Sequence, residues 1–457
     1  MIQRNETMKH ALLLLLTLLM LPAFGQARAE SSDLSADTLS AASDKDSGWL
    51  DAVDADWGGY LKARGTASWP SSDTLYDLVG LGTYLDGSLE GRLKSELFFG
   101  DFASFETHYE MVLSGGDTWR KNSELERLFP GLAAQGFIGV RIPEDDRRLV
   151  DLTSVITEND DLVLYHRIDR LALTLKPEWG VVGLGRQAVT WGNGLIFNPM
   201  DLFNPFSPTD IERDYKIGDD MVSVQAPLGG TGNLQFLYVP RRNPDTHHLS
   251  WESSSLAAKY HFAVAGTDFD LMAARHYSDY VVGIGSVGYL GDAAWRIDLT
   301  WTALDSGGPS SDYLSLVANM DYSWTWFEKN FYGLVEFFYS GIGEDDYRAA
   351  LLNPDILERL DRGELYTLGR TYLAASVTME VHPLVNVILS AITNLHDPSG
   401  VLQPRVTYDL TQNMRLTAGG SLFWGSPGSE FGGVKIPGTG FTARGADSTY
   451  LWLNWYF

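Results

Sequence analysis

The chain contains no cysteine, few basic residues for its length and almost no long apolar run, and each shortage limits what it can do. Without cysteine there is no disulfide framework and no thiolate metal site, and no cysteine can carry a lipid anchor. The 59 acidic and 34 basic residues give a net charge of −25, which argues against nucleic acid or an anionic lipid surface as the partner. After residue 29 no apolar run approaches the ~18 residues of a membrane-spanning helix, so helical spans are excluded.

The one long apolar run, near the amino terminus, has the layout of a signal peptide. Arg4 and Lys9 precede an apolar core at residues 11–21, and residues 27–29 read Ala-Arg-Ala, a cleavage site with small residues at both ends. The core is shorter than the ~20 residues that cross a bilayer as a helix. We therefore expect residues 1–29 to be removed during export; a retained membrane anchor is the alternative.

Residues 30–56 differ in composition from the rest of the chain. They are rich in Ser, Ala and Asp and contain a single basic residue, Lys45. Such segments cannot bury enough apolar surface to fold, so we predict a flexible acidic lead-in at 30–56. The last unit, at 57–457, begins where the side-chain pattern changes to a period of two.

Long segments with alternating apolar and polar residues fill residues 57–457, and residues 294–305 show the pattern clearly. One face carries Trp295, Ile297, Leu299 and Trp301, and the other carries Arg296, Asp298, Thr300 and Thr302. The segments run about 10–13 residues, whereas strands of soluble proteins average about five or six. A wall with lipid outside and water inside requires this arrangement. Lipid cannot form hydrogen bonds with the unpaired backbone groups of an open sheet edge, so the sheet must close. The predicted fold is therefore all-β, a transmembrane antiparallel β-barrel.

About 18 such segments are present, with 16 as the alternative count. They are 57–69, 85–100, 104–114, 163–176, 179–190, 219–227, 231–240, 254–265, 267–277, 279–289, 292–303, 312–326, 331–341, 366–380, 383–393, 399–409, 412–424 and 447–457. Every second connection is short, and the long connections 115–162, 191–218, 342–365 and 425–446 all fall on the other parity. We expect short turns at the periplasmic end and long extracellular loops.

The last segment ends on an aromatic residue and has apolar residues at every second position. Leu451, Leu453, Trp455 and Phe457 alternate with Tyr450, Trp452, Asn454 and Tyr456. This segment resembles the carboxy-terminal assembly strand of Gram-negative outer-membrane β-barrel proteins. The resemblance implies insertion into the outer membrane by the barrel-assembly machinery with periplasmic chaperones, among outer-membrane lipid and lipopolysaccharide.

The connection at 191–218 is too apolar for a loop in water. About 28 residues long, it contains Phe197, Leu202, Phe203 and Phe206, and a loop of this length is usually functional. We predict that it folds into the lumen and constricts it. The alternatives are a cap on the barrel mouth or a contact in a homo-oligomer. The predicted constriction residues are Asn198, Asp201, Asn204, Asp210, Glu212 and Asp214.

The same region contains a recurring set of Gly, Asn, Pro and Trp residues. Gly185-Arg186-Gln187 precedes Trp191-Gly192-Asn193-Gly194, and Asn198-Pro199 and Asn204-Pro205 follow. This block of about 30 residues resembles one in a poorly characterised family of large porin-like outer-membrane proteins. The resemblance implies a barrel with an ordered loop and does not indicate a substrate.

Basic residues gather on the predicted lumen face near the closing seam. The predicted pore-lining residues are Lys62, Arg64, Arg92, Lys94, Arg186, Arg405 and Arg415. A basic wall opposite the acidic loop would give a field across the pore that orients dipolar solutes. Glu90, Glu96 and Asp409 lie among these bases, so ordinary ion-pair ladders are the alternative.

No motif in the chain indicates catalysis. The histidines after residue 29 have no nucleophile or metal ligand at a recognisable spacing, and the nucleophile-elbow, zincin and P-loop motifs are absent. We predict no enzyme, no cofactor and no metal. A barrel of 16–18 strands leaves an aqueous lumen, so the predicted function is a channel for small solutes. The alternatives are a conduit for hydrophobic compounds, lipid or polysaccharide that works with a periplasmic machine, and a structural or adhesive barrel.

Overall fold

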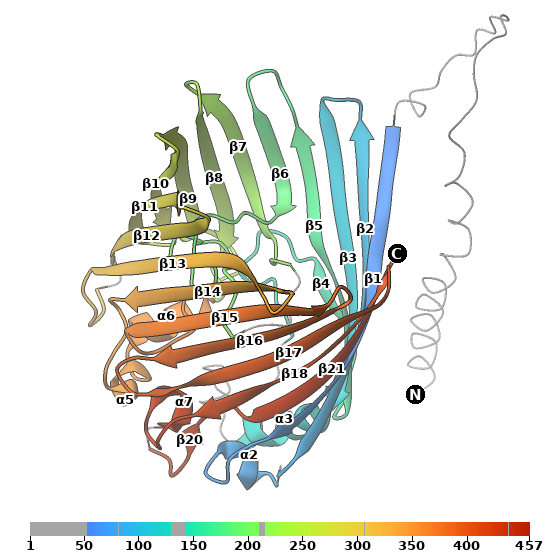
Figure 1. Cartoon of the computed structure of the whole chain (residues 1–457), viewed down its shortest axis with the longest axis vertical. Helices are drawn as coiled ribbons and strands as arrows, with labels where there is room; N and C mark the ends of the chain where they lie inside the picture. Colours follow the sequence, from blue (N-terminus) through green and yellow to red (C-terminus); the bar gives the residue numbers. More distant parts are fainter. Residues whose placement is uncertain (1–52, 81, 129–141, 210–214, 306, 437) are drawn as a thin grey trace, which may run out of the picture.

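The computed structural model describes residues 53–80, 82–128, 142–209, 215–305, 307–436 and 438–457. The predicted signal peptide and the lead-in as far as residue 52 lie outside them. Within the described residues, the alternating segments pair into one antiparallel sheet that closes on itself (Figure 1). No helix of the described part of the chain is both long enough and apolar enough to cross a bilayer.

Eighteen strands follow one another around the barrel in chain order, so the alternative count of 16 is wrong. They are β1 (Val53–Trp69), β2 (Tyr84–Phe99), β3 (Ala103–Gly116), β5 (Leu162–Leu175), β6 (Val181–Gln187), β7 (Asp219–Leu228), β8 (Gly232–Arg242), β9 (Leu249–Val264), β10 (Thr267–His276), β11 (Asp279–Leu290), β12 (Ala293–Ala303), β13 (Tyr313–Trp326), β14 (Lys329–Ser340), β15 (Thr371–His382), β16 (Val385–Asn394), β17 (Ser399–Thr411), β18 (Met414–Trp424) and β21 (Asp447–Tyr456).

Strand β21 closes the barrel between β18 and β1. Its pairing with β1 runs from Tyr60 opposite Tyr456 to Trp69 opposite Asp447, and its other edge pairs with β18. Beyond the strand, Phe457 exchanges two backbone hydrogen bonds with Gly59, at 2.9 and 3.1 Å. The predicted terminal strand is therefore the closing strand of the barrel.

The connections divide as predicted into a turn end and a loop end. The turn end has short hairpin turns, such as residues 265–266 and 327–328. The loop end has the long connections and the small elements that they contain (Figure 1). These elements are α2 (Leu75–Leu78), α3 (Asp117–Leu128), β4 (Thr153–Glu158), α5 (Tyr347–Ala350), α6 (Pro354–Asp361), α7 (Glu430–Gly433), β19 (Val434–Lys435) and β20 (Thr442–Ala443).

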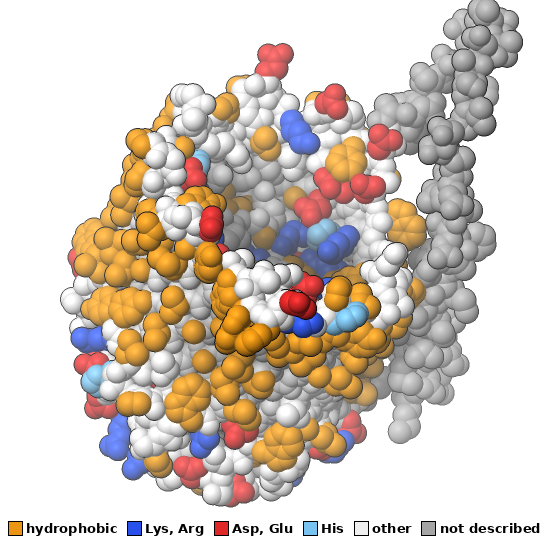
Figure 2. Space-filling model, viewed as in Figure 1, with side chains coloured by type: hydrophobic (Ala, Val, Ile, Leu, Met, Phe, Trp, Pro, Cys, Tyr) orange, Lys and Arg blue, Asp and Glu red, His pale blue; other side chains and the backbone are white. Residues whose placement is uncertain are grey.

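The two faces of the wall separate as the alternation predicts. On β12 the outward Ile297 is 42% exposed, whereas the lumen-facing Asp298 next to it is 0% exposed. Figure 2 shows apolar side chains covering much of the outer surface of the strands and a hollow with Lys, Arg and His side chains inside it. The wall therefore has an apolar outer face and a polar, charged inner one.

Several predicted strand ends are wrong because pairing, and not local sequence, decides where a strand stops. β1 begins at Val53 and takes in part of the predicted lead-in, because residues 53–56 pair with the end of β2. The predicted segment 179–190 ends early at Gln187, β9 begins five residues early at Leu249, and β15 begins late at Thr371. The early end of β6 leaves room for the long loop that follows.

A segment of the β3–β5 connection completes the wall at the loop end of β6 and β7. Strand β4 pairs with the loop-end half of β5, and β6 pairs with the other half of the same edge. Arg148, just before β4, forms a bridge with Arg241 of β8. This segment therefore occupies the wall position that longer β6 and β7 strands would have held.

Candidate functional site

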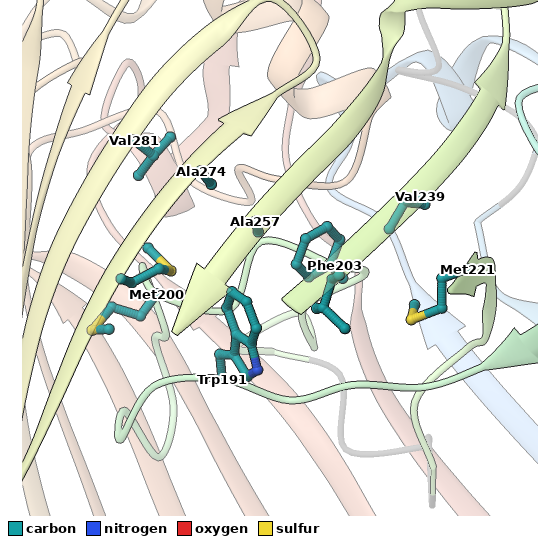
Figure 3. Close-up of a cluster of buried hydrophobic side chains, with 10 residues drawn as sticks. Trp191, Met200, Phe203, Met221, Val239, Ala257, Ala274 and Val281 are labelled. Atoms are coloured by element: carbon teal, nitrogen blue, oxygen red, sulfur yellow. The ribbon is translucent and has the colours of Figure 1, made fainter. Parts of the chain in front are cut away.

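The loop between β6 and β7, residues 188–218, is called the inner loop here because it packs on the lumen side of the wall. Trp191, Met200 and Phe203 are at most 1% exposed. They pack against lumen-facing side chains of β7–β11, including Met221, Leu237, Val239, Ala257, Met272, Ala274 and Val281 (Figure 3). Burial of three such side chains stabilises the loop by roughly 4–9 kcal/mol. Its apolar residues thus find cover inside the barrel.

The described residues of the inner loop form a first limb (188–209) and a returning limb (215–218). Two carboxylates of the wall hold the backbone of the first limb. Glu336 of β14 accepts hydrogen bonds from the N–H groups of Leu195 (2.8 Å), Ile196 (3.1 Å) and Phe197 (2.6 Å). Asp298 of β12 accepts from the backbone N–H of Asn193 at 2.5 Å and from its side-chain amide at 2.7 Å. Both carboxylates are 0% exposed, so these bonds form away from bulk water.

Gly192 and Gly194 belong to the sequence block that resembles the porin-like family, and the backbone geometry of the first limb requires glycine at both positions. Gly192 has φ +82, and a Cβ there would lie 2.1 Å from Oδ1 of Asn198. A Cβ on Gly194 would lie 1.8 Å from the carbonyl oxygen of Phe197. Glycine is therefore needed at both positions for the tight turns that present the loop N–H groups to the wall.

The inner loop also contacts the opposite part of the wall, from β14 to β17. The ring of Phe197 stacks on Phe338 of β14 with centroids 4.4 Å apart, in a cluster that includes Tyr372, Ile392 and Val401 of β15–β17. Gln403 of β17 donates to the carbonyl oxygen of Thr209 at 2.9 Å. The described part of the loop therefore contacts the wall on both sides of the lumen.

The returning limb is pinned to β2 and β3 through Tyr215. The guanidinium of Arg92 lies 3.3 Å from the centre of the Tyr215 ring, and the Tyr215 hydroxyl donates to Glu110. Burial, followed by the charges of Glu110 and Glu90, raises the pKa of Tyr215, so the hydroxyl keeps its proton and remains a donor. Arg92 also pairs with Asp169 at 2.7 Å. This limb thus ends on a network of paired charges.

Asp169 reaches this network through a β-bulge. The register of β3 against β5 shifts at this point, so that His108 lies opposite Arg170 and Tyr109 opposite Ile168. The extra residue turns both Asp169 (2% exposed) and its neighbour Arg170 (8% exposed) into the lumen. Strict alternation would place one of the two outside, so the sequence pattern alone misses Asp169.

The two limbs of the inner loop are joined by an ion pair between Asp201 and Lys216. Asp201 also accepts from the backbone N–H of Trp191 at 3.4 Å. Burial raises the pKa of Asp201 to about 6, although Lys216 opposes the rise, and burial lowers the pKa of Lys216. Burial therefore disfavours the charged form of each group, and Asp201 takes up a proton as the pH falls through about 6.

We expect the ion selectivity of the barrel to change between pH 7 and 5 through Asp201. Its pKa in the folded chain lies above the ordinary 3.8, so it gains a proton as the pH falls through about 6 and leaves Lys216 without a counter-charge. By the same sign, proton uptake at Asp201 does not favour acid unfolding. Reversal potentials across a salt gradient should shift towards anions as the pH falls. Asp201→Asn should be anion-shifted already at pH 7 and lose most of the change, and an unaltered pH profile in this variant would contradict the assignment.

The connection between β14 and β15 also folds inward. Arg359 of α6 pairs with Asp279 of β11, and Ile356 of α6 is 0% exposed. Burial alone would raise the pKa of Glu364, but His276, Arg362 and Arg359 lower it to about 2, so Glu364 stays ionised. The sequence pattern does not predict α6 as part of the lumen.

A cavity of about 1300 Å³ lies at the loop end. Asn204 and Ile217 of the inner loop line it, together with Arg241 of β8 and with Arg148, Tyr277 and Arg362 from the surrounding connections. The cavity therefore leads from the loop end to the inner loop. In the described residues, no group of three or more His, Cys, Asp or Glu side chains could hold a metal ion.

The structure brings four of the seven predicted pore-lining residues together. Lys62 and Arg64 of β1 lie beside β21, and Arg415 and Arg405 follow on β18 and β17. Lys94 lies on β2, opposite Gly58 of β1. Arg92 belongs to the Tyr215 network. Arg186 lies apart, 3% exposed and paired with Asp145 (3.0 Å) and Asp220 (2.9 Å), where it holds the wall segment before β4.

The predicted constriction residues divide into two groups. Asn198 donates to the carbonyl oxygen of Trp191 at 2.9 Å, and Asn204 has φ +52, so both shape the loop. Asp201 forms its ion pair with Lys216 of the same loop. The other three, Asp210, Glu212 and Asp214, lie outside the described residues. The field between an acidic loop and a basic wall therefore stays a prediction.

Comparison with known proteins finds likeness in structure alone. No family model matches the chain, and no curated protein matches its sequence. Among solved structures, OccAB2 of Acinetobacter baumannii is 8% identical with a TM-score of 0.50 and covers 88% of this chain and 98% of its own. A BenF-like porin from Pseudomonas fluorescens Pf-5 is 11% identical, also with a TM-score of 0.50, and covers 90% of this chain and 100% of its own. The chain therefore has the fold of outer-membrane porins.

Proposed function

We propose that this protein is an outer-membrane channel through which small solutes pass, narrowed by its inner loop. The observation that carries the proposal is the path of that loop. It leaves the wall at Gln187, contacts lumen-facing residues from β7 to β17 and returns along β2 and β3 before β7 begins. A barrel of 18 strands encloses an aqueous lumen, and a loop tied across it decides what passes.

The location and export of the chain form part of the proposal. Residues 1–29 would direct export and be removed, and the terminal strand 447–457 would be recognised by the assembly machinery. The turn end would then face the periplasm and the loop end the outside, next to lipopolysaccharide. The proposal assigns no catalytic role, since passage through the lumen requires only the polar wall and the loop.

Recording from the purified full chain in a planar bilayer tests the channel directly. We expect ohmic single-channel conductance on the order of a nanosiemens or below, because the inner loop occupies part of an aqueous lumen. Passage of small solutes into liposomes should accompany it. A folded barrel that gives no current and no solute flux would contradict a channel and favour a structural barrel, whereas flux of lipid or apolar compounds alone would favour a dedicated conduit.

A further inference from the structure

The inner loop covers charged side chains of the wall on both sides of the lumen. Arg92 and Glu110 lie against Tyr215 of the returning limb, and Asp298 and Glu336 bind the backbone of the first limb. All four charged side chains are at most 2% exposed. Charged groups that line an open aqueous pore face water, so the docked loop obstructs the middle of the barrel. Part of this loop has to leave the wall if solutes are to pass as proposed.

Residues 198–209 of the first limb, called the gate segment here, follow directly on the part that Glu336 holds. Met200 and Phe203 dock this segment, and their side chains belong to the buried cluster of Figure 3. A cavity of about 80 Å³ remains between residues 198–202 and the wall strands β11–β14. Atoms that line such a space have no contact partner on that side. The contact between the gate segment and the wall is therefore incompletely filled.

Asp201 is the one charged residue in the sequence 198–209, and docking removes it from water. It is 4% exposed and lies on the 80 Å³ cavity. Its ion-pair partner Lys216 also donates to the carbonyl oxygen of Val189 at 2.5 Å. A gate segment that leaves the wall carries Asp201 into water. Asp201 therefore has two environments, one buried beside Lys216 and one hydrated.

Other charged groups face Asp201 or Lys216 from the elements packed around them. They are Lys259 of β9, Asp279 of β11, Asp219 of β7, Arg170 of β5, and Arg359 and Glu364 of the β14–β15 connection. Each of these groups has an ion-pair partner outside the gate segment. His276 packs edge-on against Phe203, but its ring nitrogens face Ser255 and Glu364. Asp201 is therefore the group whose charge depends most directly on docking.

We propose that the gate segment is an acid-closing gate, in which a proton on Asp201 holds the segment against the wall and loss of that proton releases it. The inference rests on the proposed channel function and adds its regulation. Burial of a neutral carboxyl group costs far less than burial of a carboxylate. The protonated group can also donate to an oxygen of the cavity, whose lining includes the hydroxyls of Thr300, Ser315 and Ser340.

The direction of the pH dependence follows from the two environments of Asp201. Burial raises its pKa to about 6 in the docked loop, although Lys216 opposes the rise, and the ordinary pKa of this carboxyl is 3.8. The docked state therefore binds the proton more tightly, so acid favours docking. This contribution is fully present below the ordinary pKa and is lost as the pH rises through about 6. Between pH 7 and pH 5 the ratio of docked to released loops should rise by about tenfold.

Planar-bilayer recordings of the purified full chain test the gate directly. The salt concentration is held constant while the pH is lowered from about 7 to about 5 on both sides. We expect the ratio of closed to open time to rise by about tenfold over this range. A ratio that does not change, or a channel that opens on acidification, would overturn the proposal.

Three variants locate the titrating group. Asp201→Asn is uncharged at every pH, so it should stay mostly closed at pH 7 and give a flat profile. Lys216→Met removes the charge that holds the pKa of Asp201 down, so closure should begin at a higher pH than in the native chain. Asp245→Asn, in the exposed turn between β8 and β9, is the matched control and should keep the native profile. A native pH profile in Asp201→Asn would place the titration at another group, such as His276, and would refute the gate.

A label on the gate segment separates this inference from the proposed function. The chain has no cysteine, so Phe206→Cys, at a position that is 39% exposed, carries a single nitroxide spin label. The label should become less mobile between pH 7 and pH 5, and Asp201→Asn should hold it immobile at both. A mobility change without any current would contradict the channel and leave a pH-dependent loop. A current and a label mobility that ignore pH would overturn the gate and leave the channel intact.

Discussion

Deletion of residues 198–208 from the inner loop will raise the single-channel conductance by about twofold or more, because conductance follows the open area of the narrowest section. The deleted segment contains Met200 and Phe203, which are buried against the lumen wall, and it ends before Thr209, which Gln403 holds on the opposite side. Planar-bilayer recordings at one salt concentration provide the measurement. A conductance equal to that of the full chain would show that the loop does not constrict the pore.

The barrel itself should survive this deletion. Its strands are joined by continuous ladders around the ring, and the deleted residues belong to no strand. Heat-dependent mobility on gels, which reports a folded barrel, should therefore stay unchanged. This control separates a widened pore from a misfolded one.

A matched pair of point variants shows whether packing holds the loop. Phe203 is 1% exposed and Phe206 is 39% exposed, three residues further along the same loop. Phe203→Ala should weaken the docking of the loop by about 3–5 kcal/mol, the usual cost of removing a buried phenyl ring, and give a noisy or enlarged open state. Phe206→Ala should leave the recordings close to those of the native chain.

Glu336→Gln will loosen the first limb of the inner loop without changing the volume of the side chain. The substitution puts an amide NH₂ where a carboxylate oxygen now accepts from loop N–H groups, so donors face donors. Hydrogen bonds to a charged group contribute roughly 1.5–3 kcal/mol each, so the docked loop should lose several kcal/mol. Asp298→Asn should act in the same direction through Asn193.

Two measurements report this loosening. The open-channel current should fluctuate between levels, and a protease should cut the inner loop of the folded barrel faster than in the native chain. Glu178→Gln, in the exposed turn between β5 and β6, is the control for the same chemical change and should alter neither. Steady currents and unchanged cleavage in Glu336→Gln would show that the loop is held by its apolar packing alone.

The fold was readable from the sequence because its determinant is local. Alternation along β12 shows which of Ile297 and Asp298 faces lipid, and the lengths of successive connections separate the turn end from the loop end. The terminal residues 447–457 likewise follow from an alternation that ends on Phe457. Lipid on one face and water on the other repeat the same requirement at every strand, so the pattern recurs along the chain.

The contacts of the site were readable only in part. The apolar composition of 191–218 predicts that this loop needs cover, but Glu336 and Phe197 are separated by 139 residues along the chain. The signal that could have pointed to Glu336 is its isolation as a lone carboxylate within the aromatic-rich β14. Which loop atoms meet that carboxylate depends on the closure of the barrel, and no local pattern records it.

By itself, the sequence determined that the chain forms a barrel, the approximate number of strands and which face of each strand points outward. It also identified the loop that is too apolar to be exposed to water. Only the tertiary structure decided the charge partners. It paired Asp201 with Lys216 within the loop, removed Arg186 from the pore lining by burying it between Asp145 and Asp220, and used a bulge to turn Asp169 inward. The reason is physical. The alternation of side chains follows from the local backbone geometry of a strand, whereas ion pairs in the lumen depend on strands that meet only after the sheet has closed.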